Sequence, residues 1–224
     1  MRADSLENLT HYFEREGFAF YLSPACPLDL ERLCDLVRLR ARPALWLKET
    51  RRRKIMADGG CLVKLYTCNG LRDLTHSRRY ASREVECYHD FLKAFGELPG
   101  VRLPQLYGYF ARPFLGVLFR ANGLVEEFVE GTRQTTVAEL PLLPPLFAHL
   151  YRRAIYHPDM QFQNILWEEA EQRLVPIDYM GCNILEKPSW EALLMQLAWN
   201  ASSAIFVMLS GICTKASDGQ KANA

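Results

Sequence analysis

The 224-residue sequence lacks the patterns that mark secreted, zinc-binding and nucleic-acid-binding proteins. Its amino terminus has no apolar run, so no secretion signal is expected. The seven cysteines are scattered, with no CxxC pair and no His/Cys cluster, which argues against structural zinc and against a disulfide framework. Such cysteines suit a reducing, cytoplasmic setting. No recognisable RNA- or DNA-binding motif is present, and no nucleic-acid partner is expected.

Negatively charged residues are scarce between positions 32 and 83, although the net charge of the whole chain is only +1. Residues 32–83 carry fourteen Lys and Arg against four Asp and Glu. The simplest interpretation is a solvated basic face. The alternative is a region that meets anions, such as nucleotide phosphates, a phosphorylated glycolipid or a membrane surface. The hydrophobic fraction of 49% is enough for one large domain or two small lobes.

Strand signals dominate the first half. Ala44–Leu47, Arg51–Ala57 and Cys61–Tyr66 are expected to be strands, and Lys64 lies in the last of them. The second and third join at Asp58-Gly59-Gly60, a strong hairpin signal because these residues tolerate positive φ.

A helix is expected over Ser82–Phe95. Its apolar residues recur at steps of three and four, and Glu84 shares their face with Tyr88, Phe91 and Phe95. The opposite face carries Glu86, Asp90 and Lys93. Glu84, and not Glu86, should therefore point towards the body of the protein.

The second half predicts further elements. They are a hairpin of Leu115–Phe119 with Leu124–Val129 around Asn122-Gly123, a helix from near Pro145 to about Ile155, short strands at residues 164–167 and 174–177, and a helix over Trp190–Cys213. The order indicates an α+β fold with a small β-rich N-lobe, residues 1–126, and a short, mostly helical C-lobe, residues 127–213. Residues 214–224 are expected to form a disordered tail.

The stretch Tyr156–Leu166, with Ile177 to Gly181 after it, carries the most specific chemistry. It supplies Asp159, Asn164 and Asp178 in the order that phosphoryl transfer from ATP requires: one carboxylate orients the attacking hydroxyl, and an amide and a second carboxylate hold Mg²⁺. The alternative is a common Asp- and Asn-rich turn before a strand, with Asp178 as a strand-end carboxylate.

These residues resemble the protein-kinase-like superfamily, most closely its bacterial lipopolysaccharide-kinase branch, the Kdo and heptose kinases of the inner core. The resemblance runs from about Trp46 to Gly181. It rests on the ordered set of Lys64, Glu84, the Leu124–Gly131 hinge, the Asp159/Asn164 loop and Asp178.

The resemblance implies a bilobal kinase-like fold that uses ATP and Mg²⁺. It implies that Lys64 reaches the α- and β-phosphates and is held by Glu84, and that Asp159 is the catalytic base. Asn164 and Asp178 would be the Mg²⁺ ligands. Backbone groups near Glu127 and Val129 would meet adenine, and His157 would shape the loop.

Each position also has a simpler interpretation. Lys64 could face solvent from its strand, Glu84 could be an ordinary helix-surface acid, and Leu124–Gly131 could be an edge strand.

The sequence departs from the family pattern in two ways. No G-x-G-x-x-G loop precedes Lys64, and Thr50-Arg51-Arg52-Arg53 occupies that neighbourhood. Only 25 residues separate Gly131 from His157, and no A-P-E segment follows. The second departure argues against a regulated Ser/Thr/Tyr kinase.

The leading hypothesis is therefore phosphorylation of a sugar hydroxyl of the lipopolysaccharide inner core. A small-molecule kinase of the aminoglycoside or choline phosphotransferase type, and a non-catalytic kinase-fold binding or regulatory protein, stay open. The expected partner is a glycolipid or small-molecule acceptor. The expected location is the cytoplasm, with peripheral contact at the inner membrane open because Leu193–Cys213 has no charged residue.

Overall fold

A computed structural model describes residues 11–50, 53–66, 71–111, 123–179 and 181–198, without the side chains of residues 71–82 and 137. The chain divides into two compact units. The first contains Met1–Asp90 and Pro104–Glu130, and the second contains Phe91–Leu103 and Gly131–Ala224. The second unit thus includes residues 91–103, whereas the sequence-based division has a single boundary after residue 126.

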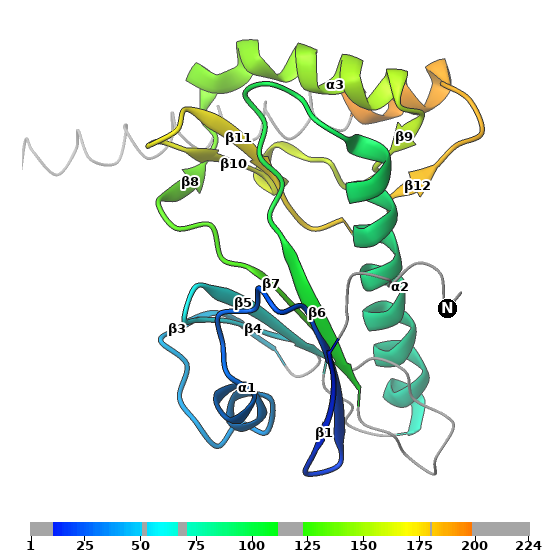
Figure 1. Cartoon of the computed structure of the whole chain (residues 1–224). Coiled ribbons are helices and arrows are strands. Elements are labelled where there is room, and N and C mark those ends of the chain that lie inside the picture. The colour runs from blue at the N-terminus through cyan, green and yellow to red at the C-terminus, as the bar shows by residue number, and fades with distance from the viewer. Residues whose placement is uncertain (1–10, 51–52, 67–70, 112–122, 180, 199–224) are drawn as a thin grey trace, which may run out of the picture. The chain divides into compact units, whose positions relative to one another are not determined.

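The first unit is built on a seven-stranded antiparallel sheet in the order β1-β2-β6-β7-β5-β4-β3 (Figure 1). Its elements along the chain are β1 (His11–Arg15), β2 (Phe18–Leu22), α1 (Leu30–Val37), β3 (Leu45–Glu49), β4 (Arg53–Asp58), β5 (Cys61–Tyr66), α2 (Leu71–Phe95), β6 (Leu106–Ala111) and β7 (Gly123–Glu127).

Alternation along the strands divides this sheet into two faces. On one face, Val63 and Leu65 of β5 join the cluster that contains the buried side of α1. On the other, Tyr66 joins a cluster with Val85 of α2 and Leu124 of β7. Lys64 has the same parity as Tyr66, so it lies on the face that carries Val85.

Several expected elements are confirmed. The Asp58-Gly59-Gly60 turn joins β4 to β5, and both glycines have positive φ, at 51° and 76°. The predicted helix over Ser82–Phe95 is present, but α2 begins earlier, at Leu71. β1, β2 and α1 lie before the first element that the sequence predicted.

The hairpin predicted around Asn122-Gly123 is wrong, because the second predicted strand pairs with other strands than Leu115–Phe119. β7 pairs with β5 on one side and with β6 on the other, and Leu115–Phe119 lies outside the described residues. Gly123 is the first residue of β7 and not a turn glycine. A Cβ there would stand 2.2 Å from the Lys64 carbonyl oxygen, so glycine is needed for close strand packing.

The second unit combines small sheets with helices. Its elements are β8 (Thr132–Gln134), the 3₁₀ helix η2 (Val137–Leu142), α3 (Leu143–Arg152), β9 (Ile155–Tyr156), the 3₁₀ helix η3 (Phe162–Asn164), β10 (Ile165–Glu168), β11 (Arg173–Pro176) and β12 (Asn183–Ile184). The antiparallel sheet has the order β11-β10-β8, and β12 pairs with β9 (Figure 1).

Two predictions for this unit are confirmed. α3 has prolines in its first turn, where their missing N–H groups need no partner. β10 and β11 form the expected strand pair around a polar turn. The core includes the ring of Phe91, whose centroid lies 4.3 Å from that of Tyr179 and 5.2 Å from that of Phe95.

Residues 190–198 are helical. The rest of the helix predicted up to Cys213, and the predicted tail, lie outside the described residues. Within the described part of the chain, no helix combines the length and the apolar character needed to cross a bilayer.

Candidate functional site

In the first unit, Lys64 and Glu84 form a buried ion pair. The Lys64 Nζ atom lies 2.7 Å from Glu84 Oε1, and the two residues are 3% and 0% exposed. Lys64 is on β5, near the centre of the sheet, and Glu84 is on the face of α2 that also buries Tyr88 and Phe91. Glu86 is exposed. The simpler interpretation of both residues as solvent-facing is therefore excluded.

Glu126 is a member of this cluster that the sequence did not predict. Its Oε1 lies 2.9 Å from Lys64 Nζ, and the residue is 4% exposed. β5 and β7 pair Leu62 with Glu126 and Lys64 with Leu124, which makes Lys64 and Glu126 diagonal neighbours on one face. Tyr66 completes the cluster, because its hydroxyl donates to Glu84 Oε2.

This cluster buries three charged groups, which is costly for a feature with only a structural role. One ammonium and two carboxylates are removed from water, and such desolvation is expensive even for well-paired ions. An apolar set of similar volume would stabilise the sheet as well or better. Buried charges retained under that penalty are candidates for a functional role.

The predicted hinge follows directly after Glu126. The Glu127 backbone N–H donates to the Gln105 carbonyl at 2.8 Å, and the Phe128 N–H donates to the Gly60 carbonyl at 2.9 Å. The backbone N–H of Glu127 is therefore already used within the first unit. Val129 is buried, at 6% exposure. Their predicted contact with adenine stays a prediction.

Thr50 and Arg53, which flank the segment found where a glycine-rich loop would precede Lys64, are hydrogen-bonded to one another. The Thr50 N–H donates to the Arg53 carbonyl at 2.9 Å, and the Arg53 N–H donates to Thr50 Oγ1 at 2.9 Å. Arg51 and Arg52 lie outside the described residues.

Much of the basic region is matched by acidic partners. Arg32 pairs with Asp58 at 2.7 Å, while Arg38 and Arg40 both pair with Glu16. Lys54 pairs with Glu49. For these four residues, the pairs favour a solvated basic face over an open anion-binding surface.

In the second unit, a short hydrogen-bonded loop positions Asp159 and Asn164. The Asn164 Nδ2 atom donates to the Asp159 carbonyl at 2.8 Å, and Gln161 Nε2 donates to Asp159 Oδ1 at 2.8 Å. Thr135 supports this loop by donating its hydroxyl to the carbonyls of Phe162 and Ile165. Because the Asn164 Nδ2 atom donates to the Asp159 carbonyl, the side-chain oxygen of Asn164 points away from that carbonyl.

Asp178 is brought close to Asn164 by the β10–β11 hairpin. The Ile177 N–H donates to the Asn164 carbonyl at 2.9 Å, one residue before Asp178. Asp178 has φ at +61°, and Gly181 at +86°. A left-handed non-glycine residue in a tight turn is one of the forms of backbone strain that gather at functional sites. A Cβ at Gly181 would lie 3.3 Å from Pro158 Cγ, which shows that the two loops touch.

His157 lies beneath these loops and is 0% exposed. Its ring makes edge contacts with Phe91 and Tyr179, at centroid distances of 6.1 and 6.0 Å. Burial lowers the pKa of His157 to about 4, so the imidazole is neutral at pH 7. This agrees with the interpretation of His157 as a residue that shapes the loop.

The donor set in the second unit fits Mg²⁺. Asp178 offers carboxylate oxygens and Asn164 an amide oxygen, and Mg²⁺ prefers a few oxygen ligands completed by water and substrate phosphates. No group of three or more His, Cys, Asp or Glu side chains that could hold a metal occurs in the described ranges. A dedicated all-protein metal cage is therefore not seen there.

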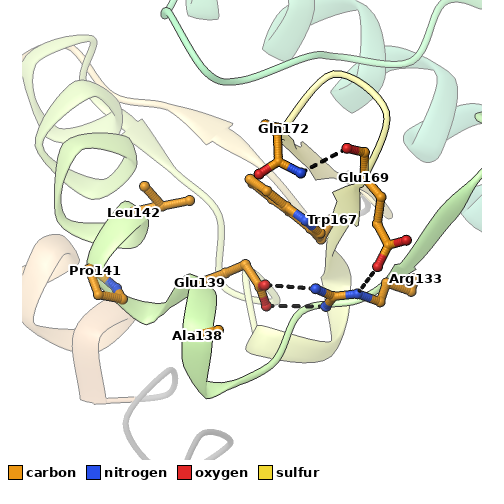
Figure 2. Close-up of a pocket in the computed structure, with 8 residues that line it drawn as sticks. All are labelled: Arg133, Ala138, Glu139, Pro141, Leu142, Trp167, Glu169 and Gln172. Atoms are coloured by element: carbon orange, nitrogen blue, oxygen red, sulfur yellow. Dashed lines mark hydrogen bonds and ion pairs between the residues drawn. The ribbon is translucent and has the colours of Figure 1, made fainter.

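A separate surface hollow of about 640 Å³ lies in the second unit between η2 and the turn after β10 (Figure 2). Arg133 lines it, and its guanidinium pairs with Glu139 at 2.8 Å and with Glu169 at 2.7 Å. Figure 2 shows that both carboxylates point at this group, so its charge is neutralised within the protein. This hollow therefore lacks the open cation expected of a phosphate site.

The structure thus brings together Lys64 with Glu84 in the first unit, and Asp159, Asn164 and Asp178 through contiguous loops in the second. The order is a strand lysine, a helix glutamate, a hinge strand, an Asp/Asn loop and an Asp turn. It is the order of a protein-kinase-like α+β fold, as the sequence predicted.

A scan against protein-family models and a search of curated proteins find no match. Among the solved structures that are similar to the chain are two at 16% sequence identity each. "WaaP in complex with acyl carrier protein" has a TM-score of 0.48, with 76% of this chain and 74% of that chain covered. The Cydia pomonella granulovirus kinase PK-1 has a TM-score of 0.41, with 72% and 58% covered. Structural similarity at this level of sequence identity does not establish a shared function. The function has to be inferred from the residues of this chain.

Proposed function

We propose that this protein is an ATP- and Mg²⁺-dependent phosphotransferase that phosphorylates a sugar hydroxyl of the lipopolysaccharide inner core. The buried Lys64–Glu84 ion pair is the observation that carries the proposal. A lysine fixed on a central strand by a helix glutamate is the arrangement that protein kinases use to hold nucleotide phosphates. The Asp159, Asn164 and Asp178 loops of the second unit support it independently.

Each residue has a defined task under this proposal. Lys64 donates to the α- and β-phosphates, and Glu84 keeps its ammonium oriented. Asp159 accepts or orients the proton of the acceptor hydroxyl. Asn164 and Asp178 provide oxygen ligands to Mg²⁺, which neutralises charge on the transferring phosphoryl group when bound. The carbonyl of Glu127 and the backbone of Val129 would meet the adenine edge.

The sugar acceptor is the finer part of the proposal and rests on the resemblance to Kdo and heptose kinases. An exposed apolar stripe supports work at a membrane surface, where a glycolipid acceptor resides. Trp190, Leu194 and Leu197 follow at steps of four and three on one helix and are 64%, 63% and 41% exposed. We propose a cytoplasmic protein that contacts the inner membrane peripherally.

The decisive experiment measures phosphate transfer from radiolabelled ATP to a lipid A–Kdo–heptose acceptor, with aminoglycosides and choline as competing acceptors. Transfer should require Mg²⁺ and be lost in Glu84→Gln, while Glu86→Gln is the matched control because Glu86 is exposed on the same helix. Transfer to choline or an aminoglycoside instead would keep the kinase and replace the acceptor. Absence of transfer to every acceptor, with no Mg·ATP binding, would favour a non-catalytic scaffold.

A further inference from the structure

Two cysteines of the first unit lie together, although they are 35 positions apart in the sequence. Cys61 is the first residue of β5 and is 0% exposed. Cys26 is partly exposed and packs against the hydrophobic cluster that contains Cys61. Both are free thiols.

Their neighbourhood is built by the turn that carries Cys61. Pro27 and Leu28 lie against this turn, since a Cβ at Gly59 would stand 2.8 Å from Leu28 Cδ2 and one at Gly60 would stand 3.9 Å from Pro27 Cγ. The Cys26 thiol donates to the Leu28 carbonyl at 3.7 Å, and the backbone of Leu28 also interacts with Cys61. Each thiol shifts the pKa of the other, so the two side chains are close neighbours.

The two sulfurs differ in a way that suits stepwise oxidation. The neighbouring Cys61 lowers the pKa of the Cys26 thiol, which favours its thiolate form, and Cys26 is the more exposed of the two. The neighbouring Cys26 and burial raise the pKa of Cys61. A partly exposed thiolate beside a buried thiol is the arrangement of a redox-sensitive cysteine with its resolving partner.

We propose that Cys26 and Cys61 form a reversible oxidation site that reacts with hydrogen peroxide. The Cys26 thiolate attacks the O–O bond, so an S–O bond forms, hydroxide leaves and Cys26 becomes a sulfenic acid. The Cys61 sulfur then attacks Cys26, an S–S bond forms and the S–O bond breaks, and the oxygen leaves as water with the Cys61 proton. The two sulfurs together lose two electrons, and the peroxide is reduced to two waters.

This oxidation would link the segment before α1 to the β4–β5 turn within the first unit. The inference goes beyond the proposed function, and its test does not depend on phosphate transfer.

Trypsin provides a direct readout, because residues 16–32 and 55–64 form separate peptides with one cysteine each. The folded protein is treated with a small excess of hydrogen peroxide, remaining thiols are alkylated, and the digest is analysed without reductant. The expected product is the 16–32/55–64 linked peptide, about 2 Da lighter than the two reduced peptides together. Dithiothreitol should restore both free peptides.

Variants make the assignment specific. Cys34→Ser is the matched control, since Cys34 is 1% exposed on α1 and should be inert, and it should leave the link unchanged. Cys26→Ser should abolish the link and leave Cys61 reduced, and Cys61→Ser should let Cys26 accumulate as sulfenic or sulfinic acid. Since Cys61→Ser alters the core, the wild-type peptide map and Cys26→Ser decide the outcome. The proposal is overturned if peroxide gives no 16–32/55–64 link in the wild type, or if links to Cys34 form equally.

Discussion

At the scale of single residues, the Lys64 cluster is the most consequential feature. One ammonium lies between the carboxylates of Glu84 and Glu126, all three nearly inaccessible to water. Removing the ammonium leaves two buried carboxylates facing each other, and breaking a buried ion pair is far more destabilising than replacing it whole.

We therefore expect Lys64→Met to lower the free energy of unfolding by about 3–5 kcal/mol. Urea denaturation of the two proteins measures this. Lys93→Met is the matched control, because Lys93 is exposed at the end of the same α2 helix, and it should change stability by less than about 0.5 kcal/mol. A Lys64→Met protein as stable as the wild type would show that the carboxylates are neutral or solvated.

Asp159 should act on the acceptor and not on the nucleotide. We expect Asp159→Asn to reduce the transfer rate by about 10²–10⁴-fold, the usual contribution of a general base, with ATP affinity within about twofold of the wild type. Initial rates and calorimetric titration with Mg·ATP separate the two effects. Asp90→Asn, an exposed change on α2, serves as control. Equal turnover in the Asp159 variant would reject its role as the base.

Glu84 could be anticipated from helix periodicity, which places it on the apolar face of its helix. Lys64 could be anticipated only from its strand, its apolar neighbours and the later motifs taken together. Glu126 could not, since its contact with Lys64 depends on the register between β5 and β7, strands that are distant in sequence. The left-handed backbone conformation of Asp178 could not be predicted from the sequence either, because an Asp in a turn can adopt several conformations.

At the scale of elements, local signals explain both the successes and the failures. Asp58-Gly59 is a strong hairpin dipeptide, and β4 and β5 were predicted on either side of it. The β1–β2 hairpin turns at Glu16-Gly17, where both residues have positive φ, at 50° and 79°. Glu is not among the residues that favour such a turn, so the sequence did not predict this hairpin. β6 was not predicted, because its pairing with β2 is non-local and its other partner, β7, follows only after the eleven residues 112–122.

The 3₁₀ helix η2 has a pH-sensitive anchor. Glu139 completes a capping box with Thr136, and its carboxylate accepts a two-pronged pair from Arg133. The Arg133 guanidinium lowers the pKa of Glu139 to about 2, from an ordinary value of 4.5. The unfolded chain therefore binds more protons than the folded one between these values, and stability falls as pH drops.

We expect this anchor to contribute fully above pH 4.5 and to be lost as pH falls towards 2. The change is about 1–2 kcal/mol, after allowing for the partial solvent exposure of Arg133. Thermal or urea unfolding across this range should show a shallower pH dependence in Glu139→Gln. Glu169→Gln is the control, because Glu169 is 63% exposed and pairs with the same arginine. Identical pH profiles in the wild type and Glu139→Gln would contradict the assignment.

At the scale of the whole molecule, the predicted residues separate into two compact units. Lys64, Glu84, Glu127 and Val129 belong to the first, and Asp159, Asn164 and Asp178 to the second. The sequence-based boundary after residue 126 separates Lys64 and Glu84 from Asp159, Asn164 and Asp178 in the same way, but it assigns Glu127 and Val129 to the C-lobe, whereas they lie in the first unit. The sequence could not show that residues 91–103 belong with the second unit, since that grouping arises from contacts such as the parallel bridge between Val101 and Leu174.

Under the proposed function, residues of each unit should affect the binding of Mg·ATP. A ligand at about 100 times its Kd stabilises the folded state by about 2.7 kcal/mol, so Mg·ATP should raise Tm by several degrees.

We expect Glu84→Gln in the first unit and Asp178→Ala in the second each to reduce this rise in Tm. Asp178→Ala should also remove the dependence of the rise on Mg²⁺. Glu86→Gln and Glu191→Gln, both exposed changes, should retain it. Differential scanning calorimetry with and without Mg·ATP measures these shifts. If only one of the two substitutions affects the rise, the role of the other residue, Glu84 or Asp178, in nucleotide binding is rejected.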